Sequence, residues 1–232
     1  MIYQTYYIKN FITKGAIKMD NRTTLKDFEI EGTTLVRYLG TNPDVVIPDF
    51  ITDVYAGINH YGLCHFAFFH GDCVRSITIP KSLTEINDLT FYNCPKLEKI
   101  IVDEQNEAYY SEGNCIIERG SKTLIVGCKK SVIPQDVKRI AFGAFVACRG
   151  FAELTYNGTK QQWKELKKDR GWDIENLNSY VDPPLEGDFW DGRILNYTIH
   201  CTDGDVAKAD EDYIEDKPPM ESDGRYFGGF SF

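Results

Sequence analysis

Several features that define common protein classes are missing from this 232-residue chain. No apolar run approaches the roughly 20 residues that a helix needs to cross a bilayer, so we expect no membrane insertion. None of the seven cysteines stands in a CxxC pair, which gives no support to zinc-ribbon or thioredoxin-like interpretations. A Gly-x-Ser-x-Gly elbow and a glycine-rich phosphate loop are also absent. We therefore expect a protein that is not an enzyme and that carries no cofactor.

The chain also lacks a basic surplus. Residues 1–181 contain equal numbers of acidic and basic side chains, and residues 182–232 carry the whole net charge of −9. Nucleic acids and anionic membrane surfaces both require a basic face, so we expect neither as a partner. Residues 206–232 are predicted to be an acidic, aromatic-ended tail that is solvated or docks onto the body or a partner.

The first 18 residues lack the apolar core and the small-residue cleavage site of a signal peptide. Met19 follows residues 14–18, whose codons can include a bacterial ribosome-binding element. We expect translation to start at Met19, with a disordered extension over residues 1–18 as the alternative. Without an export signal, the expected location is the cytoplasm.

Two windows of the chain repeat each other. Ile79-Pro80 and Ile133-Pro134 are followed by apolar residues at the same offsets from proline, which are 3, 6, 11, 14, 17, 20 and 22. Pro48 begins a further copy, which carries an insertion at residues 55–63. A unit of about 23 residues is too small to bury its own apolar face, so the units are expected to stack.

Stacking predicts short strands at residues 76–79, 99–102 and 152–156 that lie side by side, each of the Ile-Pro strands being ended by its proline. The Phe-x-x-Cys-x-x-Leu part has helical spacing and is expected to face inward. It predicts two columns of side chains in the interior. One column contains Phe68, Phe91 and Phe145, and the other contains Cys94 and Cys148.

The string I-x-I-P-x-x-L-x-x-I-x-x-x-[TA]-F-x-x-C-x-x-L-x-x-I resembles the BspA-like leucine-rich repeats of bacteria, over roughly residues 27–205. The resemblance implies an α/β repeat fold, a short right-handed solenoid of short strands joined by short helical or 3-10 turns. It implies a hairpin cap over residues 19–44, repeats over 45–156 and a C-terminal helical cap over 157–205.

Local sequence features fit these parts of the resemblance. Residues 28–30 and 35–38 are similar to the N-terminal hairpin, and residues 114–126 to an internal hairpin that turns at 119–122. In the C-terminal cap, Thr159 is the expected helix N-cap and Gln162 completes a capping box. Trp163, Leu166 and Trp172 are expected to form an apolar plug, and residues 198–205 a closing strand.

The resemblance implies a non-catalytic protein-interaction scaffold of the bacterial surface or adhesion type, exposed on the cell or secreted. We expect an unidentified protein partner and a monomeric chain. Two alternatives stay open. One is a structural remnant of a larger surface protein, and the other is a metal-binding or hydrolytic protein that uses the His- and Cys-rich insertion at residues 60–73.

That insertion supplies the candidate metal ligands. Zinc binds histidine nitrogen and cysteine sulfur, so a tetrahedral set is chemically conceivable. The spacing matches no standard zinc motif, and the phenylalanines within the segment favour a core segment without a metal. The candidates are His60, Cys64, His70 and Cys73.

Overall fold

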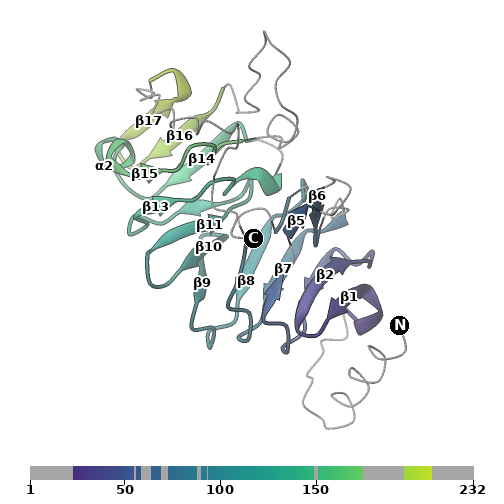
Figure 1. Cartoon of the computed structure of the whole chain (residues 1–232). Coiled ribbons are helices and arrows are strands. Elements are labelled where there is room, and N and C mark those ends of the chain that lie inside the picture. The colour runs from purple at the N-terminus through teal and green to yellow at the C-terminus, as the bar shows by residue number, and fades with distance from the viewer. Residues whose placement is uncertain are drawn as a thin grey trace, which may run out of the picture.

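The computed structural model describes residues 23–54, 56–58, 64–68, 73–87, 90–92, 94–148, 151–174 and 196–210. Short strands predominate there, and they follow one another along a stack from β1 and β2 at one end to β16 and β17 at the other (Figure 1). Helices are few: α2 (Lys160–Glu165) and the 3-10 turns η1 (Leu25–Asp27), η3 (Val146–Cys148) and η4 (Lys208–Asp210). Within the described residues, no helix has the length and apolar character needed to span a membrane.

One set of parallel strands, here called the first ladder, contains the strands that precede the repeat prolines. β3 (Asp44–Val46), β7 (Ser76–Ile79) and β8 (Lys99–Val102) pair in parallel. β12 (Val132–Ile133), β14 (Glu153–Tyr156) and β16 (Thr198–Cys201) form its second part, which ends in the antiparallel β17 (Gly204–Ala207). The predicted pairing of residues 76–79 with 99–102 is therefore confirmed.

A second ladder runs along the other side of each unit. β1 (Phe28–Glu31) pairs with β2 (Thr34–Tyr38), which continues in parallel to β4 (Asp53–Val54) and, through an isolated bridge from Asp53, to Glu85. Farther along, β11 (Thr123–Val126), β13 (Arg139–Ile140) and β15 (Lys167–Lys168) pair in parallel. Asp53, Glu85 and Arg139 all stand five residues after a repeat proline. Each repeat thus contributes a rung to both ladders, and the sequence analysis predicted only the first.

Hairpins interrupt the repeats at two places. β9 (Tyr109–Glu112), β10 (Cys115–Glu118) and β11 are antiparallel neighbours, which confirms the predicted internal hairpin. At the insertion, β5 (Ala56–Ile58) and β6 (Cys64–Phe66) form a small antiparallel pair. The closing segment is likewise a hairpin, β16 with β17, and not the single strand expected.

The interior consists of two hydrophobic clusters, so the predicted phenylalanine column is wrong at one position. The rings of Phe68 and Phe91 lie 5.2 Å apart in the first cluster. Phe145 belongs to the second cluster, where it contacts Phe151 at 5.3 Å. The hairpin β10–β11 separates them because it is buried on both faces, with Ile116 in the first cluster and Ile117 in the second.

The C-terminal part is built largely as its sequence predicts. Thr159 is the N-cap of α2: its backbone N–H donates to Gln162 Oε1 at 2.8 Å, and its hydroxyl accepts from the Gln162 backbone. Trp163 is fully buried and contacts Trp172 at 5.7 Å. The described residues of the Phe-x-x-Cys-x-x-Leu segments form turns and the 3-10 turn η3, in agreement with the short helical or 3-10 turns that the resemblance implied. Cys94 is buried, and the Cys148 side chain lies outside the described part of the structure.

A buried ion pair fastens the last hairpin to the body. The Lys208 ammonium bonds to the Asp173 carboxylate, whose side chain is 1% exposed. The same ammonium lies 4.8 Å from the centre of the Tyr197 ring. Lys208 directly follows β17, whereas Asp173 stands 35 residues earlier in the chain. The contact therefore joins two segments that are distant in sequence.

Candidate functional site

The predicted metal ligands do not form a site among the described residues. His60 and His70 lie outside the described part of the chain, and Cys64 is described only as backbone in β6. Cys73 is a half-buried free thiol. In the ranges that the structure describes, no group of three or more His, Cys, Asp or Glu side chains is placed to hold a metal ion.

The described thiols are poorly suited to nucleophilic chemistry. Burial raises the pKa of the Cys115 thiol to about 12, and burial also raises the pKa of Cys128 and Cys201. A thiol reacts as the thiolate, so a raised pKa leaves little of the reactive form at neutral pH. These side chains are therefore better described as small apolar residues.

His200 takes part in an exposed cluster of charges on the outer side of the first ladder. Its Nδ1 lies 2.9 Å from Asp205 Oδ1, and its Nε2 lies 3.7 Å from Glu153 Oε2. The hydrogen bond to Asp205 is the main reason that the His200 pKa is raised above its usual range. Since all three groups are exposed, the arrangement resembles a surface ion pair between β14, β16 and β17.

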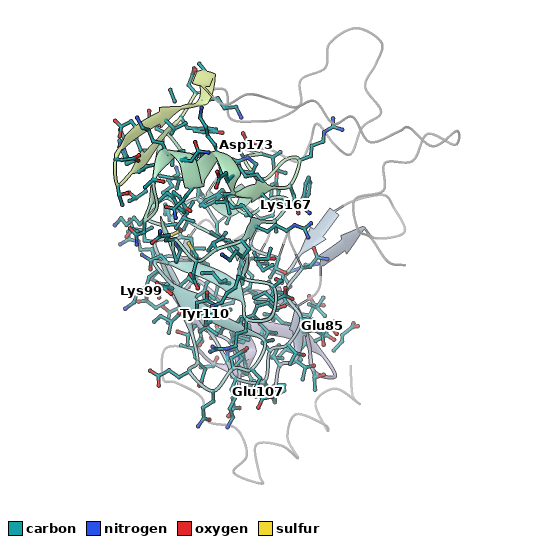
Figure 2. The ribbon with its side chains drawn as sticks, turned by 90° about the vertical axis from the view of Figure 1, so that its left-hand side faces the viewer. Glu85, Lys99, Glu107, Tyr110, Lys167 and Asp173 are labelled. Carbon is teal, nitrogen blue, oxygen red and sulfur yellow. The ribbon has the colours of Figure 1, made fainter. Side chains whose placement is uncertain are left out.

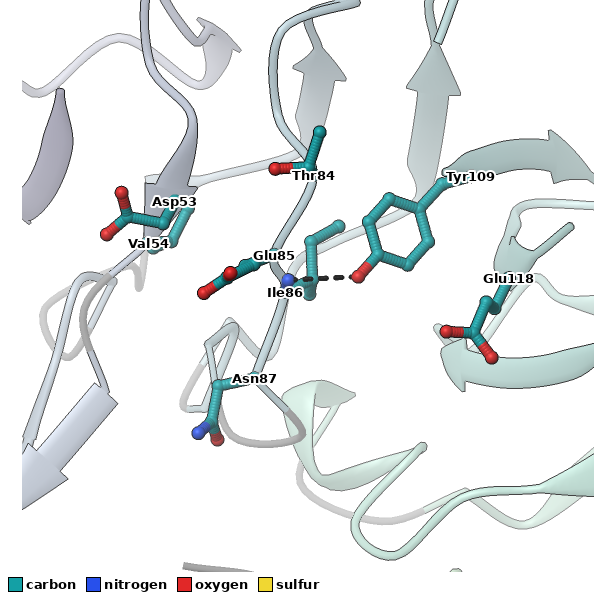
Figure 3. Close-up of a pocket in the computed structure, with 8 residues that line it drawn as sticks. All are labelled: Asp53, Val54, Thr84, Glu85, Ile86, Asn87, Tyr109 and Glu118. Carbon is teal, nitrogen blue, oxygen red and sulfur yellow. Dashed lines mark hydrogen bonds between the residues drawn. The ribbon is translucent and has the colours of Figure 1, made fainter. Parts of the chain in front are cut away.

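An open cleft of about 510 Å³ lies in the second ladder (Figure 3). It lies where the chain passes from the strand β4 and the Glu85 rung to the hairpin β9–β10. Its lining consists of Asp53, Val54, Thr84, Glu85, Ile86, Asn87, Tyr109 and Glu118.

A buried asparagine holds the cleft wall in place. The Asn106 side-chain amide donates at 2.8 Å to the carbonyl oxygens of both Pro80 and Leu83. Its side-chain oxygen accepts from the backbone N–H groups of Ala108 and Tyr109, at 2.9 Å and 2.7 Å. Asn106 therefore joins the turn after β7 to the start of β9 and satisfies buried polar groups on both sides.

Tyr109 then closes the wall from the other side. Its hydroxyl accepts a hydrogen bond of 3.1 Å from the Ile86 backbone N–H (Figure 3). The Ile86 backbone N–H thus bonds to a side chain, where a regular ladder would offer it a carbonyl oxygen of a neighbouring strand. The tyrosine ring and the Ile86 side chain give the cleft an apolar part beside its charges.

The charges of the cleft have one sign. Asp53, Glu85 and Glu118 come from three different segments, and the eight lining residues include no basic side chain. Asp53 accepts a hydrogen bond of 3.0 Å from the Thr52 hydroxyl, and Glu118 accepts one from the Ser121 hydroxyl. Carboxylates beside an aromatic ring and an aliphatic side chain are suited to the head and stem of a lysine or arginine.

Sequence reasoning missed this cleft, although part of the signal was present. Asp103 follows β8 as Pro80 follows β7, and Asn106 and Tyr109 stand three and six residues after it. They occupy the positions that Leu83 and Ile86 hold in the preceding unit. Continuing the repeat register by one more unit would have shown a polar residue in an otherwise apolar position.

Comparison with protein-family models identifies the repeats in part of the chain. Residues 51–114 match the family model described as "BspA type Leucine rich repeat region (6 copies)". Residues 51–114 therefore carry BspA-type leucine-rich repeats, as the resemblance of the sequence predicted. The matched segment includes the cleft residues from Asp53 to Tyr109. The curated proteins and the solved structures that were compared contain no match.

Proposed function

We propose that this chain is a non-catalytic leucine-rich-repeat protein that binds another protein through the outer surface of its stacked repeats. The family match supports a repeat protein of the kind used for protein interaction. Repeat stacks bind through extended surfaces because successive units present equivalent positions side by side. The observation that carries the proposal is the acidic cleft, which is open to solvent and combines the carboxylates of Asp53, Glu85 and Glu118 with largely buried apolar residues.

The architecture that we propose is a short right-handed solenoid closed at both ends. Two parallel ladders that share the same repeat units support the solenoid. In this proposal the hairpin β1–β2 caps the N-terminal end, within the segment 19–44 that the sequence assigns to the cap. The repeats occupy residues 45–156, and α2 with the hairpin β16–β17 forms the C-terminal cap, which was expected over residues 157–205 and extends to Ala207. Caps of this kind cover strand edges that would otherwise be open to aggregation.

The proposal is tested by comparing what three forms of the chain retain from an extract of the native cell. The wild type is compared with the cleft variant Asp53→Lys/Glu85→Lys. The matched control is Glu98→Lys/Glu153→Lys, which makes the same change in charge at two exposed positions, one directly before β8 and one in β14 of the first ladder. We expect the wild type and the control to retain the same protein and the cleft variant to lose it, as measured by quantitative mass spectrometry. Equal retention by all three forms would contradict the proposal.

We also propose that the chain works in a reducing compartment such as the cytoplasm. The described residues include five free thiols, at Cys73, Cys94, Cys115, Cys128 and Cys201. Three of these are buried and pack as small apolar side chains. Alkylation of the native protein after unfolding without a reductant should label all five, whereas a disulfide among them would leave at least two unlabelled.

A further inference from the structure

The outer side of the second ladder changes sign along its length. The two positions that stand four and five residues after the repeat proline are Thr52-Asp53 and Thr84-Glu85 in the first units, and Lys138-Arg139 in a later one. Arg139 pairs with Lys167 on the next rung. We call Asp53, Glu85, Lys138, Arg139 and Lys167 the charged stripe, with an acidic end and a basic end.

Asp53, Glu85, Arg139 and Lys167 share one side of the molecule, and Lys138 is an exposed neighbour of Arg139. Figure 2 shows Glu85 and Lys167 toward one side, whereas Lys99 of the first ladder lies toward the other. The residue that follows the charged one in each strand points inward: Val54 after Asp53 and Ile140 after Arg139 are both buried. Alternation along a strand therefore sends the charged residue of each rung outward.

Only one of the stripe charges is balanced by an ion pair among the described residues. Arg139 donates two hydrogen bonds to Asp169, from Nε to Oδ1 at 2.7 Å and from Nη2 to Oδ2 at 2.6 Å. Within the described ranges, Asp53, Glu85, Lys138 and Lys167 take part in no ion pair, and the last three are exposed. The stripe thus has both acidic and basic groups available to a partner.

We propose that a second copy of this chain docks on the charged stripe in an antiparallel arrangement. A two-fold rotation places the acidic end of one copy against the basic end of the other, so one surface supplies both halves of the interface. The cleft at the acidic end receives Lys138 or Lys167 of the second copy. Their ammonium groups meet Asp53, Glu85 and Glu118, and their alkyl stems lie against Ile86 and Tyr109.

A second copy fits this surface because the stripe is self-complementary. A purely basic partner would be attracted by the acidic cleft but repelled by Lys138 and Lys167. A purely acidic partner would be attracted by these lysines but repelled by the cleft. This inference rests on the proposed function, for which it names a partner. It is an alternative to the expectation of a monomer, which came from sequence alone.

Sedimentation velocity of the full chain tests the inference. We expect a dimer at about 0.1 M salt that dissociates at about 1 M salt, because the Debye length falls from about 10 Å to about 3 Å over this range. Asp53→Lys/Glu85→Lys and Lys138→Glu/Lys167→Glu should each weaken the dimer about a hundredfold, since like charges then oppose each other in both equivalent contacts. An equimolar mixture of the two variants should form a heterodimer, because each contact again joins opposite charges.

The controls carry the same changes in charge on the first ladder. Glu98→Lys/Glu153→Lys and Lys99→Glu/Lys130→Glu should dimerise like the wild type. A wild-type chain that stays monomeric at low salt, or stripe variants that dimerise like the wild type, would overturn the inference. Recovery of the heterodimer also shows that both variants are folded. If the chain is monomeric but retention of a cellular protein still depends on Asp53 and Glu85, this inference fails and the proposed function stands.

Discussion

At the residue scale, one buried polar side chain decides how the repeat units meet at the cleft. Asn106 is 2% exposed, and its amide group makes four hydrogen bonds to the backbone of two units. A leucine, which stands at the equivalent position of the preceding unit, would fill similar space and satisfy none of these backbone groups. Asn106 therefore gives up apolar packing, and its hydrogen bonds fix how the turn after β7 meets the start of β9.

We predict that Asn106→Ala lowers the free energy of unfolding by about 3 kcal/mol or more, because buried N–H and C=O groups lose their partners and each costs about 1–3 kcal/mol. The measurement is urea unfolding followed by circular dichroism. Gln105→Ala, at an exposed neighbouring position, serves as the control and should change stability little. Equal stability of the two variants would show that the Asn106 hydrogen bonds do not hold the junction.

At the scale of the elements, the hairpin β9–β10 depends on a turn that only certain residues can form. Cys115 pairs with Glu112, so Gly113 and Asn114 form a two-residue turn, and their φ angles of +55° and +59° match a type I′ turn. The Gly113 carbonyl accepts a hydrogen bond of 2.8 Å from the Val132 backbone N–H. This turn therefore also fastens the hairpin to β12 of the first ladder.

Gly113→Ala is predicted to destabilise the protein by about 3 kcal/mol, because left-handed backbone is strained for alanine and the new methyl group has no room. A Cβ at Gly113 would lie 1.9 Å from the Val132 carbonyl oxygen. Gly120→Ala is the matched control, since a Cβ there meets no atom within 4 Å. Thermal or urea unfolding of the two variants makes the comparison. A Gly113→Ala protein as stable as the control would be inconsistent with this turn.

Elements with strong local chemistry could be predicted from the sequence. The N-cap of α2 follows from Thr159 and Gln162 alone, and the hairpins β1–β2 and β10–β11 follow from alternating apolar residues around turn residues. The second ladder could not be predicted in this way because its later rungs, such as Arg139–Ile140, are only two residues long. Two residues are too few to show the alternation of apolar and polar side chains that predicts a strand. The pairing of such a strand also forms only when the units stack.

The phenylalanine column and the cleft required knowledge beyond local sequence. Phe145 occupies the same repeat position as Phe91, but the hairpin β10–β11 lies between them and is buried on both faces. The cleft collects Asp53, Glu85 and Glu118 from segments that meet only through the stack. Neither result follows from the spacing of residues within one repeat.

At the scale of the whole molecule, stacking turns a repeated position in the sequence into a row on the surface. Asp53 and Glu85 are neighbours because they stand five residues after Pro48 and Pro80. Arg139 has the same place after Pro134, so a change of residue type between repeats becomes a change of charge along the row. The proposed binding surface is therefore a consequence of the register in which the units stack.

That register is the central claim, and cross-strand nuclear Overhauser effects in the labelled protein measure it most directly. The structure predicts parallel contacts of Val45 with Ile77 and of Ile77 with Ile100, since these residues are opposite one another on adjacent strands. In the second ladder it predicts the contact of Leu124 with Ile140. Observation of these three contacts would support the stack. Their absence, or an antiparallel pattern between residues 76–79 and 99–102, would contradict it.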